Sequence, residues 1–196
     1  MNPRDIEFLF EIGTMKNVDR SWRQHLGMEC ASNLEHSFRV VFLALLIARR
    51  EGGADESKII KMALVHDLAE ARTSDLGYMQ KIYVASDEER AARDMFAGTS
   101  LTDLCDDVLH EYKLRESIEA KIVKDADNLD VDVEMKELEE RGSLMPEKWK
   151  PSRRIVRDQK LYTNAAKALW DELQSSDPSS WHLTSNKWHV LPNAGR

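Results

Sequence analysis

The sequence predicts an all-α fold, a globular helical bundle around one hydrophobic core. Apolar residues recur at helical spacing in several segments, whereas the strict alternation typical of β-strands is nearly absent. The chain holds only 8 Gly and 5 Pro among its 196 residues, too few for a loop-rich or fibrous protein. At this length one well-buried core is the default expectation. We therefore treat residues 1–196 as a single domain.

Two helices are predicted in the first quarter of the chain. Residues 3–12 form a short amphipathic helix, and residues 13–31 are irregular. Ser32 begins the second helix, because Glu35 follows it in the capping-box pattern, and Gly52 lies just beyond the last turn. The inward face of this helix carries residues at spacings of four, three and four: His36, Val40, Leu43 and Ile47.

The middle of the chain is predicted to hold three more helices. Asp55 begins the first of them. Its inward face carries Ile59, Met62 or Ala63, His66 and Glu70. Ser86 and Glu89 form a second capping box at the start of a charged helix that reaches about Ala97. Residues 102–112 form the next helix.

The longest helix is predicted over residues 116–142. Its apolar stripe consists of Ile118, Ile122, Ala126, Leu129 and Val133. Residues 158–174 form the last helix, and its inward residues are Leu161, Ala165, Ala168 and Leu169. The tail beyond it carries Trp181 and Trp188 without a clear period. We expect this aromatic tail, which ends at residue 196, to pack on the bundle.

Composition excludes several classes of function. The net charge is −7, with 35 acidic against 28 basic residues, which argues against nucleic-acid binding because that needs a basic face. The longest apolar run, residues 40–48, is far shorter than the roughly 20 residues that cross a bilayer. No signal peptide is visible at the N-terminus. Cys30 and Cys105 lack a paired spacing, so free thiols in a reducing, cytoplasmic compartment are a simpler interpretation than a disulfide.

Four ionisable residues stand where predicted helices turn inward: His36, His66, Asp67 and Asp127. Taken singly, each is more often a hydrogen-bonded structural residue than a ligand. Taken together, two imidazoles and two carboxylates match a mononuclear site for a divalent transition metal, with water completing the coordination. A bound cation would offset the cost of burying the carboxylates. From the spacing alone, one shared metal site and four unrelated structural residues are equally good interpretations.

The order of these residues resembles the H…HD…D signature of the HD-domain metal-dependent phosphohydrolases. The segment HDLAEARTSDL, residues 66–76, is similar to the HD-x-x-E-x-x-x-x-D motif of the 5′-deoxynucleotidase branch, the YfbR-like and HDDC-like proteins. The segment EYKLRESIEAKIVKDADNLD, residues 111–130, is similar to that branch's E-Y…S-x-E-A-K-x-V-K-x-x-D-x-x-D stretch. The likeness covers roughly residues 3–140. It implies a helical bundle of the HD-domain type, assembled as a homodimer.

The resemblance also implies roles for individual residues. Metal ligation falls to His36, His66, Asp67 and Asp127, which would hold one Co²⁺, Mn²⁺ or Zn²⁺ ion. Glu70 and Asp75 match the acids that the family places beside the substrate phosphate and the attacking water. Asp125, Asp130 and Asp132 flank Asp127 and are expected to lie mostly on the surface or around the ligands.

The family carries an Arg and a Trp that contact phosphate and nucleoside in the region of Arg20 and Trp22. Arg23 follows closely, so either arginine fits the part. Lys124, one turn before Asp127, is suited to pair with it or to steady the phosphate. Without the resemblance, Trp22 is expected to be a core residue and Glu70 a solvated acid.

The predicted reaction is hydrolysis of the 5′-phosphate of (deoxy)nucleoside monophosphates. A divalent metal would lower the pKa of water to about 7 and screen the phosphate charge. Glu70 would orient that water or manage its proton, and Asp75 would protonate the leaving 5′-oxygen. An arginine would grip the phosphate as a two-pronged donor, and Trp22 would offer a flat surface to base or sugar.

Three other functions compete with this prediction. A nucleoside triphosphate or alarmone hydrolase needs only a few more basic side chains. A dinuclear cyclic-dinucleotide phosphodiesterase needs further histidines between the HD pair and the last Asp, where the chain has only His110. A non-catalytic regulatory HD module would be expected to have lost a ligand, whereas all four candidate ligands are present.

Overall fold

The computed structural model of the chain describes residues 2–183 and 185, so that Trp188 lies outside the described residues. Throughout this part every regular element is helical, and the only β-type contact is an isolated bridge between Asp19 and Ser32. The all-α prediction is confirmed. No described helix is long and apolar enough to span a membrane. Cys30 and Cys105 are both free thiols.

The N-terminal region is more helical than predicted, because two short helical elements lie within residues 13–31, which were expected to be irregular. The side chain of Asn2 caps α1 (Pro3–Ile12), which continues into a 3₁₀ turn, η1 (Gly13–Asn17). After the short α2 (Arg23–Leu26), α3 (Asn33–Glu51) begins at the complete capping box of Ser32 and Glu35. The remaining elements in chain order are α4 (Glu56–Val65), α5 (Glu70–Thr73), α6 (Gln80–Tyr83), α7 (Glu88–Phe96), the π-helical segment η2 (Leu104–Leu109), α8 (His110–Leu114), α9 (Ile118–Glu140), α10 (Met145–Gln159), α11 (Asn164–Gln174) and α12 (Ser180–Leu183).

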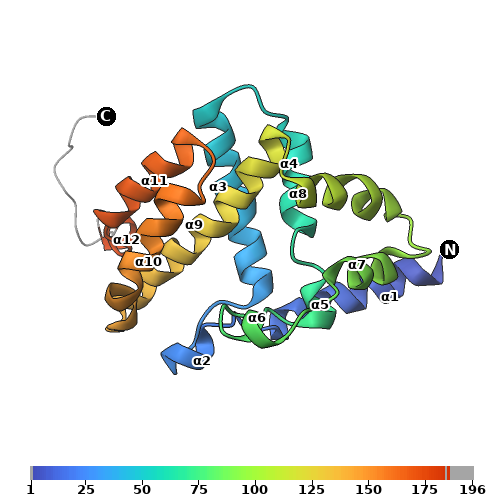
Figure 1. Cartoon of the computed structure of the whole chain (residues 1–196), viewed down its shortest axis with the longest axis horizontal. Helices are drawn as coiled ribbons and strands as arrows, with labels where there is room; N and C mark the ends of the chain where they lie inside the picture. The colour runs from blue at the N-terminus through green and yellow to red at the C-terminus, as the bar shows by residue number, and fades with distance from the viewer. Residues whose placement is uncertain (1, 184, 186–196) are drawn as a thin grey trace.

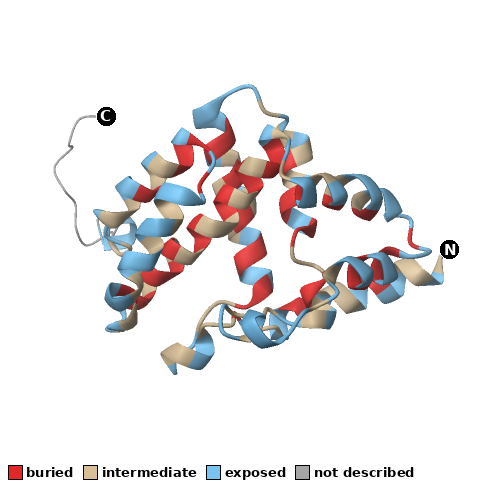
Figure 2. Cartoon of the chain, in the orientation of Figure 1, coloured by how far each residue is buried: buried red, intermediate tan, exposed pale blue. Residues whose placement is uncertain are grey.

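The centre of the molecule is the crossing of α3 and α9, which make the most extensive contact between any two elements (Figure 1). Helix α4 packs against both, and α10 and α11 cover the other flank of α9. The buried residues of these helices lie on the faces that the helices turn toward one another (Figure 2). The fully buried residues of this centre are Val40, Ala44, Ile47, Ile59, Met62, Ala63, Ile122, Val123 and Ala126.

Three helices in the middle of the chain differ from the prediction. The helix that begins at Asp55 ends at Val65 rather than continuing through Glu70. His66 Nδ1 lies 2.7 Å from Ala63 O, the carbonyl that the N–H of Asp67 would need if the helix continued. Helix α7 is capped by Asp87, whose side chain accepts from the N–H of Arg90, and not by Ser86. The predicted helix over residues 102–112 is a π-helical turn followed by α8.

The C-terminal region contains two helices that the sequence pattern did not predict, α10 and the short α12. Helix α10 is strongly charged, has few apolar residues and has Pro151 in its interior, so its helical pattern is weak in the sequence. It is bound to α9 by polar contacts, in which Arg153 donates to Asp132 and to Asn128 O. The predicted helix over residues 158–174 is therefore interrupted at residues 160–163, and α11 begins after its cap, Thr163.

Two predicted positions in this region are also wrong. Ala168 is exposed, although it was expected to face inward. Trp181 on α12 is 73% exposed, so the described part of the aromatic tail does not pack its indole on the bundle.

Candidate metal centre

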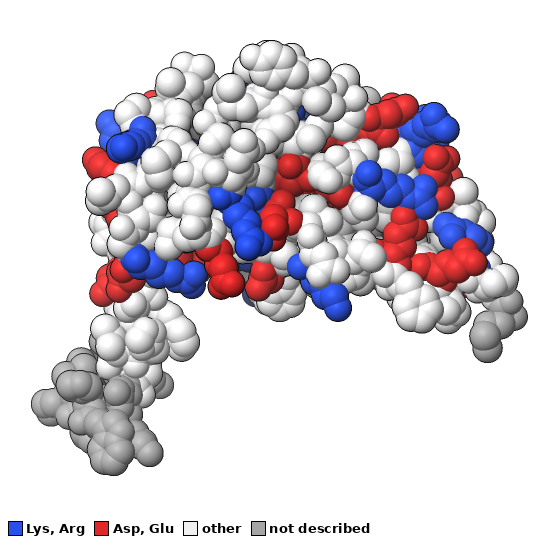
Figure 3. All heavy atoms as spheres, turned by 90° about the horizontal axis from the view of Figure 1, so that it is seen from below, with Lys and Arg blue, Asp and Glu red and all other residues white. Residues whose placement is uncertain are grey.

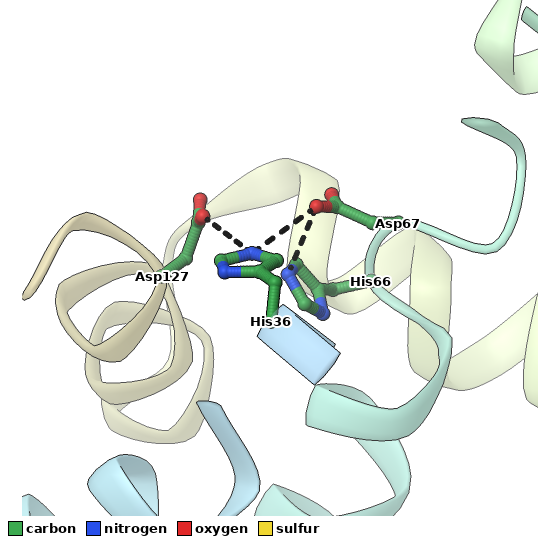
Figure 4. Close-up of side chains that lie close together, drawn as sticks. All are labelled: His36, His66, Asp67 and Asp127. Atoms are coloured by element: carbon green, nitrogen blue, oxygen red, sulfur yellow. Dashed lines mark ion pairs between the residues drawn. The ribbon is translucent and has the colours of Figure 1, made fainter. Parts of the chain in front are cut away.

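Three separate helix segments bring the four predicted ligands together. His36 comes from the first turns of α3, His66 and Asp67 follow the end of α4, and Asp127 projects from α9 (Figure 4). One ligand atom of each residue lies within 4.8 Å of all the others. Both imidazoles are buried, with exposed fractions of 0% and 3%. Because α4 ends at Val65, the adjacent residues His66 and Asp67 can both direct their side chains into the cluster.

Hydrogen bonds fix the orientation of both imidazole rings. His36 Nδ1 lies 2.6 Å from a carboxylate oxygen of Asp130, and His66 Nδ1 lies 2.7 Å from Ala63 O. Both acceptors favour a proton on Nδ1, so Nε2 is the atom of each ring that a metal would bind. At His36 the metal would replace a proton, because burial opposes protonation but the surrounding carboxylates outweigh it and raise the pKa of His36 in the metal-free chain. The two Nε2 atoms are buried and have no hydrogen-bond partner among the described residues. This is the arrangement in which proteins present histidine to a metal.

The separations of the donor atoms fit one small cation. His36 Nε2 lies 3.4 Å from Asp67 Oδ2 and 3.3 Å from Asp127 Oδ1, and His66 Nε2 lies 3.2 Å from Asp67 Oδ2. Ligands at about 2.0–2.2 Å from a metal are separated from one another by roughly 3.0–3.5 Å in octahedral or tetrahedral geometry. Two nitrogens and two carboxylates are a donor set for a divalent transition metal. The residues present therefore fit the predicted ion.

The electrostatics of the cluster favour carboxylates that carry a negative charge. Burial opposes ionisation of Asp67, but His66 and His36 outweigh it and hold the pKa of Asp67 well below its usual range. Burial likewise opposes ionisation of Asp127, and Lys124 with its Nζ 2.6 Å from Asp127 Oδ2 holds that pKa well below its usual range. Lys124 thus forms the pair with Asp127 that the sequence predicted.

Four acids on α9 form a stripe that faces α3 and the N-terminal segment. We call Asp127, Asp130, Glu134 and Glu137 the acidic stripe of α9. Asp130 binds His36 and also accepts from Arg39 Nε, while Glu137 accepts from Arg39 Nη1 at 2.7 Å. Glu134 accepts from the indole N–H of Trp22 at 3.0 Å and from the N–H of Ala31 at 2.5 Å. Of the two places expected for Asp125, Asp130 and Asp132, the surface is wrong, because all three are buried and bonded. Asp130 lies around the ligands, the other place expected, since it binds His36.

Glu70, Asp75 and Arg20 form a second polar group beside the cluster. The Nη1 of Arg20 lies 3.6 Å from Asp67 and 3.5 Å from Asp75. Asp75 accepts from the N–H of Ser21 at 3.0 Å, and Glu70 accepts from the side-chain amide of Asn33. Burial, followed by the charges of Asp67 and Asp75, raises the pKa of Glu70 to about 9. Glu70 is therefore a buried acid and not a solvated one.

The structure separates the two candidate arginines. Arg20 is buried, its Nη1 donates to Asn33 at 2.8 Å, and its Nε has no partner among the described residues. Arg23 is exposed and pairs with Asp19 at 2.7 Å. Trp22 lies with its ring 4.4 Å from the Arg20 guanidinium carbon and is partly exposed, so it is not a core residue. Arg20 and Trp22 line the cavity described next, whereas Arg23 does not.

A cavity of about 710 Å³ opens onto the carboxylates of the cluster. Its walls include Asp67, Glu70, Asp75, Lys124 and Asp127. The size lies within the range of small-molecule sites. On the face seen from below in Figure 3, Asp and Glu side chains lie recessed in the middle, with Lys and Arg side chains beside them. The cavity thus combines a metal-binding floor with cationic side chains that suit an anionic ligand.

A sequence profile of the HD domain matches residues 12–170. The chain belongs to the HD domain family. This HD domain is 31% identical over 144 residues to the 5′-deoxynucleotidase HDDC2 of Danio rerio, over 69% of this chain and 70% of that protein. It is 27% identical to the protein of the same name from Homo sapiens, over 69% of this chain and 68% of that protein. The family predicted from the motif series is confirmed.

A solved structure shares the fold. The PH0347 protein from Pyrococcus horikoshii OT3 superposes on this HD domain with a TM-score of 0.70 and 28% sequence identity, over 87% of this chain and 96% of that one. The covered share is larger than the part of the chain over which the motifs run.

The HD domain also contains site residues that sequence reasoning missed. Asn33 joins Arg20 to Glu70 through its side-chain amide, and nothing in the helical period distinguishes it from an ordinary first-turn residue. Arg115 adopts a left-handed backbone, φ 59°, and places its guanidinium carbon 3.3 Å from the centre of the Tyr112 ring, on the cavity wall. The only signal for Arg115 was its place in the matched EYKLRES segment.

Proposed function

We propose that this HD domain is a divalent-metal-dependent phosphohydrolase that removes the 5′-phosphate of deoxynucleoside monophosphates. The observation that carries the proposal is the cluster of His36, His66, Asp67 and Asp127, in which both imidazole Nε2 atoms are unpartnered beside a cavity. Relatives named 5′-deoxynucleotidase support the choice of substrate. The four residues would bind one Co²⁺, Mn²⁺ or Zn²⁺ ion, which supplies an acidified water and screens phosphate charge.

The chain's own residues divide the remaining work by position. Arg20 offers its free Nε and its Nη atoms to the phosphate, and Asn33 holds the guanidinium in place. Lys124 neutralises Asp127 and extends cationic charge to the same end of the cavity. In the metal-free chain Glu70 holds a proton at neutral pH; a cation bound nearby would favour its carboxylate, which would then orient the attacking water or take its proton. Asp75, whose carboxylate accepts from the N–H of Ser21, would relay a proton from solvent to the leaving 5′-oxygen.

The proposal is tested by phosphate release from a panel of ribo- and deoxyribonucleoside mono- and triphosphates. The chelated protein should be inactive, and adding back Co²⁺, Mn²⁺ or Zn²⁺ should restore release from monophosphates. Replacement of His66 or Asp67 by Ala should abolish metal content and turnover together, because each removes a ligand. Absence of metal-dependent release from every monophosphate would overturn the proposal. Release from triphosphates alone would instead favour a triphosphohydrolase, for which Lys81 and Arg115 supply further basic groups on the cavity wall.

We also propose that two copies associate through α3. Four large apolar side chains recur every fourth residue along its outer face, with exposed fractions between 46% and 66%: Leu34, Phe38, Phe42 and Leu46. A continuous apolar stripe of this kind is unusual on a monomer and typical of an interface. The predicted cytoplasmic location, and the predicted absence of nucleic-acid binding, remain predictions alongside this one.

A further inference from the structure

Three aromatic side chains from three distant segments meet at the wall of the metal-site cavity. His25 comes from α2, Tyr78 from the turn before α6, and Trp149 from α10. The rings of His25 and Tyr78 are stacked with centroids 5.6 Å apart and planes inclined by 25°, and Trp149 meets His25 edge-on at 6.4 Å. We call these three residues the aromatic wall. Because 124 positions of sequence separate its ends, no local period indicated it.

The aromatic wall lies away from the metal-binding residues. Its three rings contact none of the four candidate ligands, whereas Arg20 approaches Asp67 directly. Helix α9 gives a scale for the separation. Trp22, three residues before His25, is anchored to Glu134, which is two turns, or about 10 Å, beyond Asp127 along the helix. Trp149 lies one turn before Arg153 on α10. Arg153 donates to the backbone carbonyl of Asn128, the residue after Asp127.

The rings are accessible and uncommitted. Tyr78 is 63% exposed, and His25 and Trp149 are partly exposed. Among the described residues, none makes a hydrogen bond to the polar ring atoms of these three side chains. Core aromatics would be buried, and structural ones would have a partner for N–H or O–H. Figure 1 shows α2 and α6 side by side at the lower edge of the molecule, and the side chain of Gln80 on α6 donates to that of Gln24 on α2 at 2.6 Å.

We propose that the aromatic wall binds the nucleobase of the substrate by stacking. The inference rests on the proposed function, which fixes the phosphate at the metal end and directs the nucleoside away from it. An aromatic ring can stack on any nucleobase, and the three residues of the wall have no amide or carboxylate that could hydrogen-bond to the Watson–Crick edge of one base in particular. The enzyme therefore accepts all bases and prefers purines modestly, since they stack more strongly.

The test compares substrates with and without a base. Trp149→Ala should raise the KM for deoxyadenosine 5′-monophosphate by about 5- to 100-fold, the loss expected for one stacking partner. It should leave the KM for deoxyribose 5-phosphate, which has no base, and the kcat for both substrates nearly unchanged. Trp149→Phe keeps a ring and should retain most of the affinity. Trp181→Ala removes an exposed indole that does not line the cavity and serves as the matched control.

Each outcome decides the inference. A KM that rises equally for both substrates, or for neither, would overturn the stacking role, and unchanged turnover of deoxyribose 5-phosphate shows that the variant is folded. If the wild-type protein hydrolyses neither compound, the proposed function fails separately. Calorimetric titration of the wild-type and Trp149→Ala proteins with deoxyadenosine 5′-monophosphate then decides. Weaker binding by the variant supports the aromatic wall, and equal or undetectable binding by both refutes it.

Discussion

Replacement of Glu70 by Gln should stabilise the metal-free protein at neutral pH, although Glu70 is 7% exposed and lies inside a polar cluster. Most substitutions of buried polar residues destabilise a fold. Here the buried carboxyl stands near Asp67 and Asp75, and its pKa is raised from the ordinary 4.5 to about 9. Gln is nearly isosteric, and its carbonyl oxygen can still accept from the amide of Asn33.

The magnitude follows from proton linkage. Between pH 4.5 and about 9 the folded chain keeps a proton on Glu70 that the unfolded chain has released. The free energy of unfolding therefore falls by about 1.4 kcal/mol for each pH unit as the pH rises through this window. At pH 7 the accumulated penalty is about 3 kcal/mol. This figure depends on the unfolded-state pKa alone, provided that the folded-state pKa exceeds 7.

The assay is urea unfolding of the chelated wild-type and Glu70→Gln proteins between pH 5 and 8.5. All other titrating groups are common to both proteins, so the difference in unfolding free energy isolates Glu70. It should be small near pH 5 and should grow with pH in favour of the Gln variant. A saturating divalent metal should reduce the difference, since a nearby cation stabilises the carboxylate. A difference that does not change with pH would refute the reasoning.

Three further outcomes are expected. Asp130→Ala leaves His36 Nδ1 and Arg39 Nε without their buried carboxylate partner. Calorimetry should show that metal affinity falls about 10- to 100-fold, and an unchanged affinity would contradict the role of Asp130 in orienting His36. Asp125→Ala removes the acceptor of three hydrogen bonds from residues 162 and 163. Urea titrations should show the unfolding free energy lowered by roughly 3–5 kcal/mol, and a loss below about 1 kcal/mol would be inconsistent with the role of Asp125 as a buried acceptor. Phe42→Glu should convert a dimer to a monomer in light scattering, because it places a charge in the apolar stripe of α3; a wild-type monomer would rule out that interface.

Sequence period and capping chemistry predicted the helices that form the centre of the bundle. The apolar spacing of α3 and α9 located their inward faces except at Ile118, which is exposed, and the capping box at Ser32 located the start of α3. The pattern failed where polar contacts replace apolar packing. Helix α10 has few apolar residues and an interior proline, and Arg153 binds it to α9, so its apolar pattern was too weak to indicate a helix.

The residues of the site were predicted better than their surroundings. The motif series selected His36, His66, Asp67 and Asp127, and the fold brings them together. What no motif indicated were interactions between distant segments, such as the bond from Trp22 to Glu134 or the meeting of His25 with Trp149. Such contacts depend on how helices pack, and a sequence read along its length does not contain that information directly.

The acidic stripe of α9 has a consequence for how the protein folds. Asp127, Asp130, Glu134 and Glu137 lie three or four residues apart on one helix, where like charges destabilise an isolated helix. Asp127 has a local partner in Lys124, but the partners of the other three, Arg39 and Trp22 among them, arrive only when α3 and the N-terminal segment dock. Helix α9 should therefore be weakly formed in the folding transition state. Substitutions in the stripe should accelerate unfolding and leave the folding rate almost unchanged, with φ-values near zero.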